Sequence, residues 1–121
     1  MSFFPSCRLI LIAITLAMFA SVASAQFSPP TERFGVGGDP RSVAVGDFNG
    51  DGNSDLAVAN YEDGTVTILL GNGSGGFSAA AGSPIGLPNI PGPIVVGDFN
   101  GDGIPDLAAA LNVGGSIAVF R

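Results

Sequence analysis

Oxygen-bearing side chains recur at a fixed spacing in two nine-residue segments of this chain, residues 47–55 and 98–106. Both segments read D-F-N-G-D-G-x-x-D, so a carboxylate or amide oxygen stands at positions 1, 3, 5 and 9 of each. Calcium is a hard cation that takes about six to eight oxygen ligands in a flexible shell, and short loops of such side chains can supply them. Glycines at positions 4 and 6 allow the backbone to turn tightly. The spacing therefore predicts one calcium site in each segment.

The predicted ligands occupy the same places in both segments. Three carboxylates would repel one another without a cation, which is a further reason to expect a bound ion. Position 7 needs only its main-chain carbonyl, so an apolar side chain is acceptable there. A pair of ordinary polar turns is the alternative, because Asp, Asn and Gly are also common turn residues. The predicted ligands are Asp47, Asn49, Asp51, Asn53 and Asp55 in the first segment, and Asp98, Asn100, Asp102, Ile104 and Asp106 in the second.

The residues that follow each segment indicate which kind of calcium loop is present. An EF-hand loop has a final carboxylate at position 12 and continues into a helix, whereas position 12 here is Val58 or Ala109. Alternating runs separated by glycine-containing turns follow instead, which is typical of two strands joined by a tight turn. No sustained helical periodicity appears after the N-terminal region. We expect strands at residues 42–46, 56–60, 65–70, 76–81, 93–97, 107–111 and 116–120, and an outer strand over residues 27–36.

The two copies are related by an offset of 51 residues that holds without a gap as far as Phe120. The stretches VAVGDFNGDGNSDLAVAN and IVVGDFNGDGIPDLAAAL, with LLGNGSGGF after the first, resemble the FG-GAP/VCBS-type repeat of integrin α-chain β-propellers and many secreted bacterial proteins. This resemblance implies an all-β fold, a partial β-propeller of about two four-stranded blades, whose loops bind Ca²⁺. Asn49 and Asn100 stand where some relatives have Asp. Propellers of this family have more blades than this chain supplies.

The N-terminal region has the pattern of a secretory signal peptide. Arg8 precedes an apolar run of about a dozen residues and an Ala-Ser-Ala sequence before Gln26. The run is shorter than the roughly 20 apolar residues that a membrane span needs. We therefore expect a signal helix at residues 1–25, cleavage after Ala25, and a secreted or extracytoplasmic protein; an uncleaved anchor is the alternative. The remainder divides into an outer-strand segment and linker (26–41), a first repeat (42–92) and an incomplete second repeat (93–121).

Composition narrows the class of function. The chain has ten acidic and four basic residues, no histidine and a net charge of −6, and six of the ten acids are the loop carboxylates. Nucleic acid is a poor partner for such a surface. Histidine and lysine are absent, and Cys7 lies within the predicted signal peptide, so the commonest general bases and nucleophiles are missing from the mature chain. Catalysis is therefore not expected.

The sequence thus predicts a secreted, non-catalytic calcium-binding repeat protein, an adhesion or ligand-binding propeller segment whose partner is a protein or a glycan. Two alternatives are the N-terminal module of a larger secreted carbohydrate-active enzyme and a propeller lectin. Sugar sites usually use stacking aromatics, and the chain has one tyrosine, Tyr61, and no tryptophan. We expect Tyr61 to cover the sheet near a hairpin end, and Phe48 and Phe99 to pack into the core beneath the calcium sites.

Two repeats are expected to leave apolar surface uncovered. Repeat units of this kind bury their faces against neighbours, and about three or more are needed for stability. At least one apolar face and some strand edges should therefore lack a partner within the chain. Two explanations stay open: the sequence is a fragment of a longer product, or the chain forms a homo-oligomer in which three or four copies complete a propeller.

Overall fold

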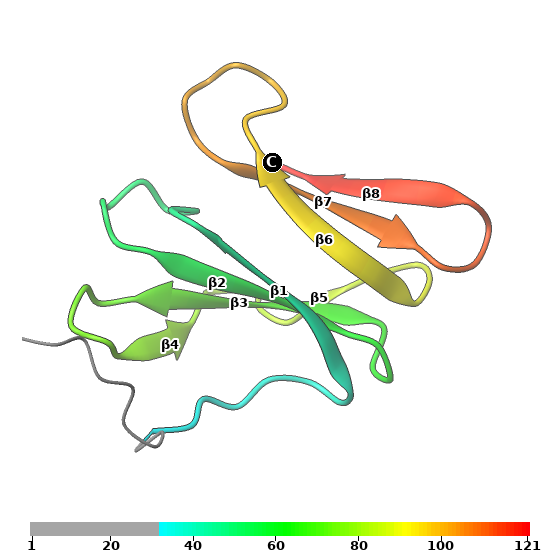
Figure 1. Cartoon of the computed structure of the whole chain (residues 1–121), viewed down its shortest axis with the longest axis horizontal. Helices are drawn as coiled ribbons and strands as arrows, with labels where there is room; N and C mark the ends of the chain where they lie inside the picture. Colours follow the sequence, from blue (N-terminus) through cyan, green and yellow to red (C-terminus); the bar gives the residue numbers. More distant parts are fainter. Residues whose placement is uncertain (1–31) are drawn as a thin grey trace, which may run out of the picture. The chain divides into compact units, whose positions relative to one another are not determined.

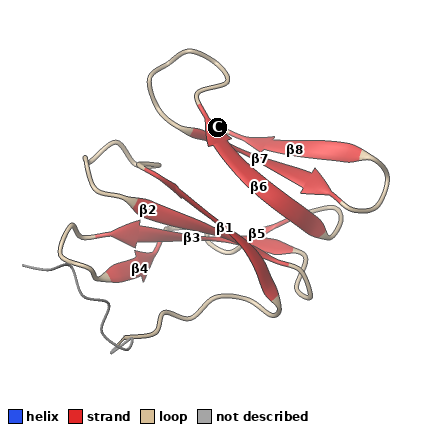
Figure 2. Cartoon of the chain, viewed as in Figure 1, coloured by secondary structure: helices blue, strands red, loops and turns tan. Residues whose placement is uncertain are grey.

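The computed structural model describes residues 32–121, which form an all-β structure without a helix (Figure 1, Figure 2). One antiparallel sheet has the strand order β1-β2-β3-β4, with β5 also paired to β3, and a second has the order β6-β7-β8. Within residues 32–121 there is no apolar helix of the length that a membrane crossing needs. The strands are β1 (Pro40–Gly46), β2 (Asp55–Asn60), β3 (Thr65–Gly71), β4 (Phe77–Ala79), β5 (Ile85–Gly86), β6 (Pro91–Gly97), β7 (Asp106–Leu111) and β8 (Ser116–Phe120).

The two sheets pair their strands in the same register, 51 residues apart. Val45 pairs with Leu56 in the first sheet, and Val96 pairs with Leu107 in the second. Both ladders are interrupted near the start of the first strand, where each sheet has a proline that cannot donate a ladder hydrogen bond. Each sheet is therefore one copy of the same unit, as the sequence offset predicts.

The core lies between the two sheets, and one face of each contributes to it. The main-chain N–H of Ile94 donates to Oγ of Ser42 at 3.2 Å, which ties β6 to β1 across the interface. Alanine at the centre of both sheets leaves little side-chain volume between them, so the strands can approach closely. The buried members are Ala57, Ala59 and Val66 from the first sheet, and Ile94, Leu107 and Ala109 from the second.

The strands expected from residue 42 onward are found, with one shorter than expected, and one further strand was not foreseen. The strand expected at 76–81 is only β4, because the chain turns after it: the N–H of Ser83 donates to the carbonyl of Ala80 at 3.0 Å. The two-residue strand β5 was not expected. The first sheet thus has the four strands of a predicted blade and β5, and the second has three described strands.

The expected outer strand over residues 27–36 is wrong for its described part, because residues 32–37 form no strand. Phe34 instead packs edge-on against Phe77 of β4, with ring centroids 5.2 Å apart and an interplanar angle of 75°. Side-chain packing, and not a ladder of main-chain hydrogen bonds, therefore places this segment. Residues 27–31, the predicted signal helix and the predicted cleavage after Ala25 lie outside the described residues.

Gly71, at the end of β3, lets the first sheet close against the loop before β2. A Cβ atom on Gly71 would collide with the main-chain oxygen of Ser54, and backbone cannot move aside cheaply. We expect Gly71→Ala to lower the free energy of unfolding by about 1–3 kcal/mol, measured by urea denaturation followed by circular dichroism. Gly86→Ala is the matched control, because a Cβ at Gly86 meets nothing within 4 Å. Equal stability of the two variants would contradict this packing.

Candidate functional site

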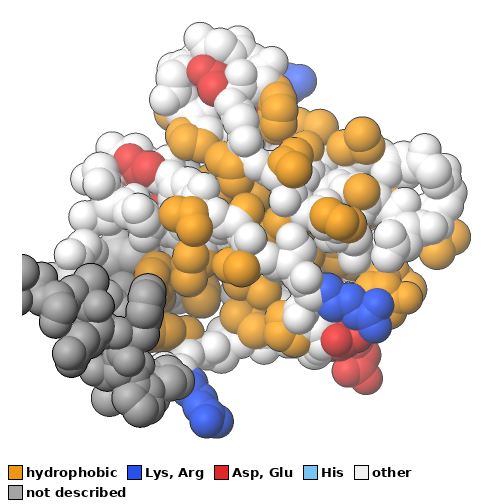
Figure 3. Space-filling model, viewed as in Figure 1, with side chains coloured by type: hydrophobic (Ala, Val, Ile, Leu, Met, Phe, Trp, Pro, Cys, Tyr) orange, Lys and Arg blue, Asp and Glu red, His pale blue; other side chains and the backbone are white. Residues whose placement is uncertain are grey.

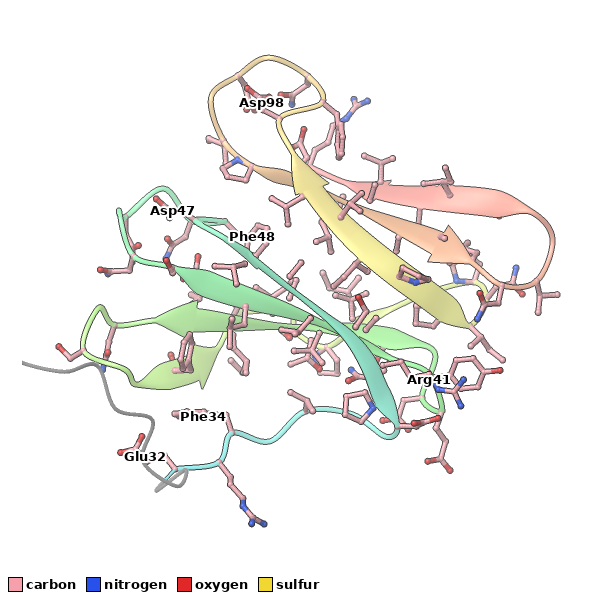
Figure 4. The ribbon with its side chains drawn as sticks, in the orientation of Figure 1. Glu32, Phe34, Arg41, Asp47, Phe48 and Asp98 are labelled. Atoms are coloured by element: carbon pink, nitrogen blue, oxygen red, sulfur yellow. The ribbon has the colours of Figure 1, made fainter. Side chains whose placement is uncertain are left out.

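Each predicted calcium segment forms the loop between the first two strands of its sheet. Figure 4 shows Asp47 and Asp98 in these loops, beside the ends of β1 and β6. The carboxylate of Asp47 accepts hydrogen bonds from the main-chain N–H of Asp51 at 3.1 Å and of Gly52 at 2.8 Å. Asp98 accepts from the corresponding N–H groups of the second loop at 3.1 and 2.8 Å. The first carboxylate thus organises each loop in the same way.

The side chains at positions 3 and 5 also make matching hydrogen bonds in the two loops. Oδ1 of Asn49 accepts from the N–H of Asp51 at 3.2 Å, and Nδ2 of Asn49 donates to Oδ2 of Asp51 at 3.2 Å. Oδ1 of Asp51 in turn accepts from the N–H of Asn53 at 2.8 Å. The same bonds occur in the second loop, at 3.1, 3.1 and 2.8 Å, among Asn100, Asp102 and Ile104. Oxygens from positions 1, 3 and 5 therefore gather around one backbone turn in both loops.

The turn depends on the paired glycines of the motif. Gly50 and Gly52 have φ values of 72° and 85°, and Gly101 and Gly103 have 77° and 86°. This left-handed region is costly for residues that carry a Cβ atom, and glycine enters it freely. The glycines therefore allow the main-chain N–H groups to point at the loop carboxylates.

These N–H donors stabilise negative charge on the loops. The main-chain N–H of Asn53 is the largest cause that lowers the pKa of Asp51 below its ordinary value. The pKa of Asp98 is also lowered, first by the main-chain N–H of Gly103. Hydrogen bonds to a carboxylate favour its ionised form. Both side chains are therefore held as anions at neutral pH, the state in which a carboxylate binds a cation.

The carboxylate at position 9 is buried and has a different environment from the others. Asp55 accepts from the N–H of Phe48 through one oxygen and from the N–H of Gly71 through the other, both at 2.8 Å. Asp106 is also buried and accepts from the N–H of Phe99 at 2.9 Å. In each sheet this side chain fastens the start of the loop to the second strand, and in the first sheet it also fastens β3.

The residues fit a calcium ion in the chemistry of their donors, because both loops offer carboxylate and amide oxygens and no softer ligand. The side chains at positions 1, 3 and 5 are grouped, whereas Asp55 and Asp106 are turned to main-chain N–H groups. Asn53 and Ile104, whose carbonyls were expected to bind, enter the network described above through their N–H groups. Among residues 32–121, no three Asp, Glu, His or Cys side chains gather closely enough to hold a metal ion. The calcium ligands therefore stay a prediction.

The two loop phenylalanines differ in their surroundings. Phe48 packs against the core cluster between the sheets, as expected (Figure 4). Phe99 has the same place in the second loop but is 52% exposed. The expectation that Phe99 fills the core is therefore wrong, because within residues 32–121 no sheet covers that face of the second sheet.

The FG-GAP-like repeat is the family whose model matches this chain, over residues 47–109. This range is more than half of the sequence and includes both candidate loops. The chain belongs to the FG-GAP-like repeat family. Its two sheets are accordingly propeller-type blades, in agreement with the all-β structure and the repeated register. Neither a curated protein nor a solved structure matches the chain.

Sequence reasoning missed a polar cluster on the first FG-GAP-like repeat. Arg41 forms an ion pair with Asp39 at 2.8 Å, and its guanidinium carbon lies 3.5 Å from the centroid of the Tyr61 ring. The hydrogen bond with Asp39 is the largest cause that raises the pKa of Arg41. Arg41 and Tyr61 are 20 residues apart, so no local pattern links them. Only the pairing of β1 with β2 brings them together.

The role of Gly71 was also missed. Gly71 is the last residue of β3, and together with the glycines that follow it lines an open cleft of about 380 Å³ whose other side is formed by Gly52, Asn53 and Ser54 of the first loop. The signal in the sequence was a glycine at the end of an apolar run.

The unequal bonding of Asp55 and Asp106 predicts unequal effects of the same substitution. An amide has one acceptor oxygen and one donor nitrogen, so Asp55→Asn cannot accept from both Phe48 and Gly71. We expect Asp55→Asn to lower the free energy of unfolding by about 1–3 kcal/mol. Asp106→Asn should cost less, because its amide oxygen can keep the one bond from Phe99. Urea denaturation with a chelator present measures both without a contribution from metal, and equal losses would contradict this arrangement.

Proposed function

We propose that this chain is an exported, non-catalytic calcium-binding propeller segment that presents an adhesion or ligand-binding surface. The observation that carries the proposal is the identity of the two loops. Their oxygen side chains make corresponding hydrogen bonds at positions 1, 3 and 5, and at position 9 each carboxylate accepts from the N–H of the loop phenylalanine, although the loops lie in different sheets. A pair of unrelated polar turns would have no reason to share this pattern.

Calcium would be held in each loop by the grouped oxygens, with the carboxylate at position 9 and the main-chain carbonyl at position 7 as further ligands. The predicted side-chain ligands at positions 1, 3 and 5 are Asp47, Asn49 and Asp51 in one loop, and Asp98, Asn100 and Asp102 in the other. A bound divalent cation neutralises neighbouring carboxylates and so favours the folded loop. The role of the ion in this proposal is structural.

The carboxylates outside the loops support a non-catalytic role. Asp39 is engaged by Arg41, and Asp63 accepts a hydrogen bond from the main-chain N–H of Gly38 at 2.7 Å. Both therefore have structural tasks at the end of the sheet where β1 begins. The sequence has no histidine and no lysine, two of the side chains that act as general bases.

The ligand of the proposed surface is a protein or a glycan. The exposed Arg41, lying over the ring of the partly buried Tyr61, offers one preorganised contact for such a ligand. A guanidinium on an aromatic face keeps its hydrogen-bond donors available at the edge of the pair. A glycan array and a protein-binding screen with Arg41→Ala as the control would identify the class of ligand.

Calcium titration tests the metal sites. Isothermal titration calorimetry should show about two equivalents bound per chain, and Asp51→Ala or Asp102→Ala should each remove about one, because each removes a charged ligand from one loop only. Circular dichroism should show a gain of ordered structure on binding. Asp63→Ala, which removes an exposed carboxylate outside the loops, should leave both equivalents. If both loop variants still bind two, the ligand assignment fails.

Export can be tested without reference to calcium. We expect the protein collected outside the producing cell to begin at Gln26, as shown by N-terminal sequencing or intact mass. Leu11→Arg, which places a charge in the apolar run, should keep the chain inside the cell. A mature protein that retains residues 1–25 would rule out cleavage and favour an anchor.

A further inference from the structure

One face of the second sheet is entirely apolar and uncovered within the described residues. Side chains alternate between the faces of a strand, so the residues beside the core-facing Ile94, Ala109 and Ala118 point away from the first sheet. We call this surface the open face; Ile117 at its edge is 69% exposed. Hydrophobic side chains gather over β6 and β8 in Figure 3, while the loop acids lie away from them. The open face consists of Val95, Phe99, Ala108, Ala110, Ile117 and Val119.

The first sheet has a face that corresponds to the open face, and its contacts show what such a face packs against. Residues 51 positions earlier occupy the same register and form the side of the first sheet that packs against the second. Val66, the counterpart of Ile117, is fully buried there, and Phe48, the counterpart of Phe99, packs against the same cluster. These counterparts are Ala44, Phe48, Ala57, Ala59, Val66 and Ile68. The open face is therefore a second copy of a surface that this chain already uses as an interface.

The chain also carries an exposed surface of the kind that covers this interface. In the second sheet, Ile94 and Val96 of β6 pack into the core against the first sheet. Their counterparts in the first sheet, Val43 and Val45 of β1, are 63% and 59% exposed. We call the side of the first sheet that bears Val43 and Val45 the far face. The exposed β1 part of the far face is thus related to the open face as β6 is to the first sheet in the existing interface, whereas Val58 and Leu69 on the same side are already buried within the chain.

We propose that the open face of the second sheet binds the far face of the first sheet in another copy of this chain, head to tail. The interface continues the packing between the two sheets by one more step, with Ala108 and Ala110 at the positions that Ala57 and Ala59 occupy in the existing interface. It is heterologous, so successive copies close into a ring or extend as a filament, depending on the rotation between the sheets. The proposal does not rest on calcium binding or on export.

The contact between copies would be apolar. Within the chain, the N–H of Ile94 donates to Ser42 across the interface. Pro93 stands at the position equivalent to Ser42, so the contact between copies lacks this hydrogen bond. Association then depends on burial of the exposed valines, isoleucine and phenylalanine, which is the dominant favourable term in most protein association.

The proposal can be tested by size-exclusion chromatography with light scattering in calcium-containing buffer. The protein is expressed from its complete sequence, so that it can be exported. The mass should rise with concentration in the micromolar range. Ile117→Asp on the open face or Val45→Asp on the far face should each weaken association by about thirtyfold or more, because each places a charge on an apolar surface that association would bury. Val113→Asp is the matched control, because Val113 is also exposed but lies in a hairpin turn off both faces.

Mixing the two variants distinguishes the head-to-tail contact from other modes and from misfolding. The Ile117→Asp chain keeps an intact far face and the Val45→Asp chain an intact open face, so an equimolar mixture should form a one-to-one dimer that cannot grow. Two unfolded variants could not restore each other in this way. A wild-type chain that stays monomeric would overturn the proposal, as would self-association of Val45→Asp alone, which would indicate open face meeting open face.

Discussion

The conformation of each loop depends on the buried carboxylate at its end. Asp55 accepts one main-chain N–H from the loop and another from the end of β3, so it sets the path of both segments at once. A buried carboxylate without donors would be strongly unfavourable. The loop therefore cannot move away from β2 or β3 without leaving that charge unpaired. Asp106 gives the second loop the corresponding anchor to Phe99.

This anchoring leaves the outer part of each loop free to carry charge. The side chains at positions 1, 3 and 5 are exposed or near the surface. Main-chain N–H groups lower the pKa of Asp51 and of Asp98, which favours the ionised form of both. Acidic side chains are thus concentrated at the loops, and apolar ones at the faces of the sheets. In the proposed function the loops bind ions that preserve the fold. The faces remain available for contacts between blades.

The two blades are repeats of one unit, so each of the two surfaces that form the interface between them occurs twice in the chain. A blade of this family presents two different faces, and packing two blades together covers one face of each. The remaining two are the far face, with Val45, and the open face, with Ile117. Because the units are alike in register, the open face matches the exposed β1 part of the far face. The family relationship and the inferred assembly therefore follow from the same 51-residue offset.

The sequence by itself determined the local features of the protein. Glycines at fixed loop positions allow the left-handed turns that are found, and alternation of residue types placed all the main strands. The direction of Asp55 and the contact of Gly71 with Ser54 were decided by the tertiary structure, since both depend on segments about 16 residues apart. Phe48 and Phe99 make the same point, because an identical motif places both. Whether each is buried depends on what packs against its sheet, and that is not a property of the motif.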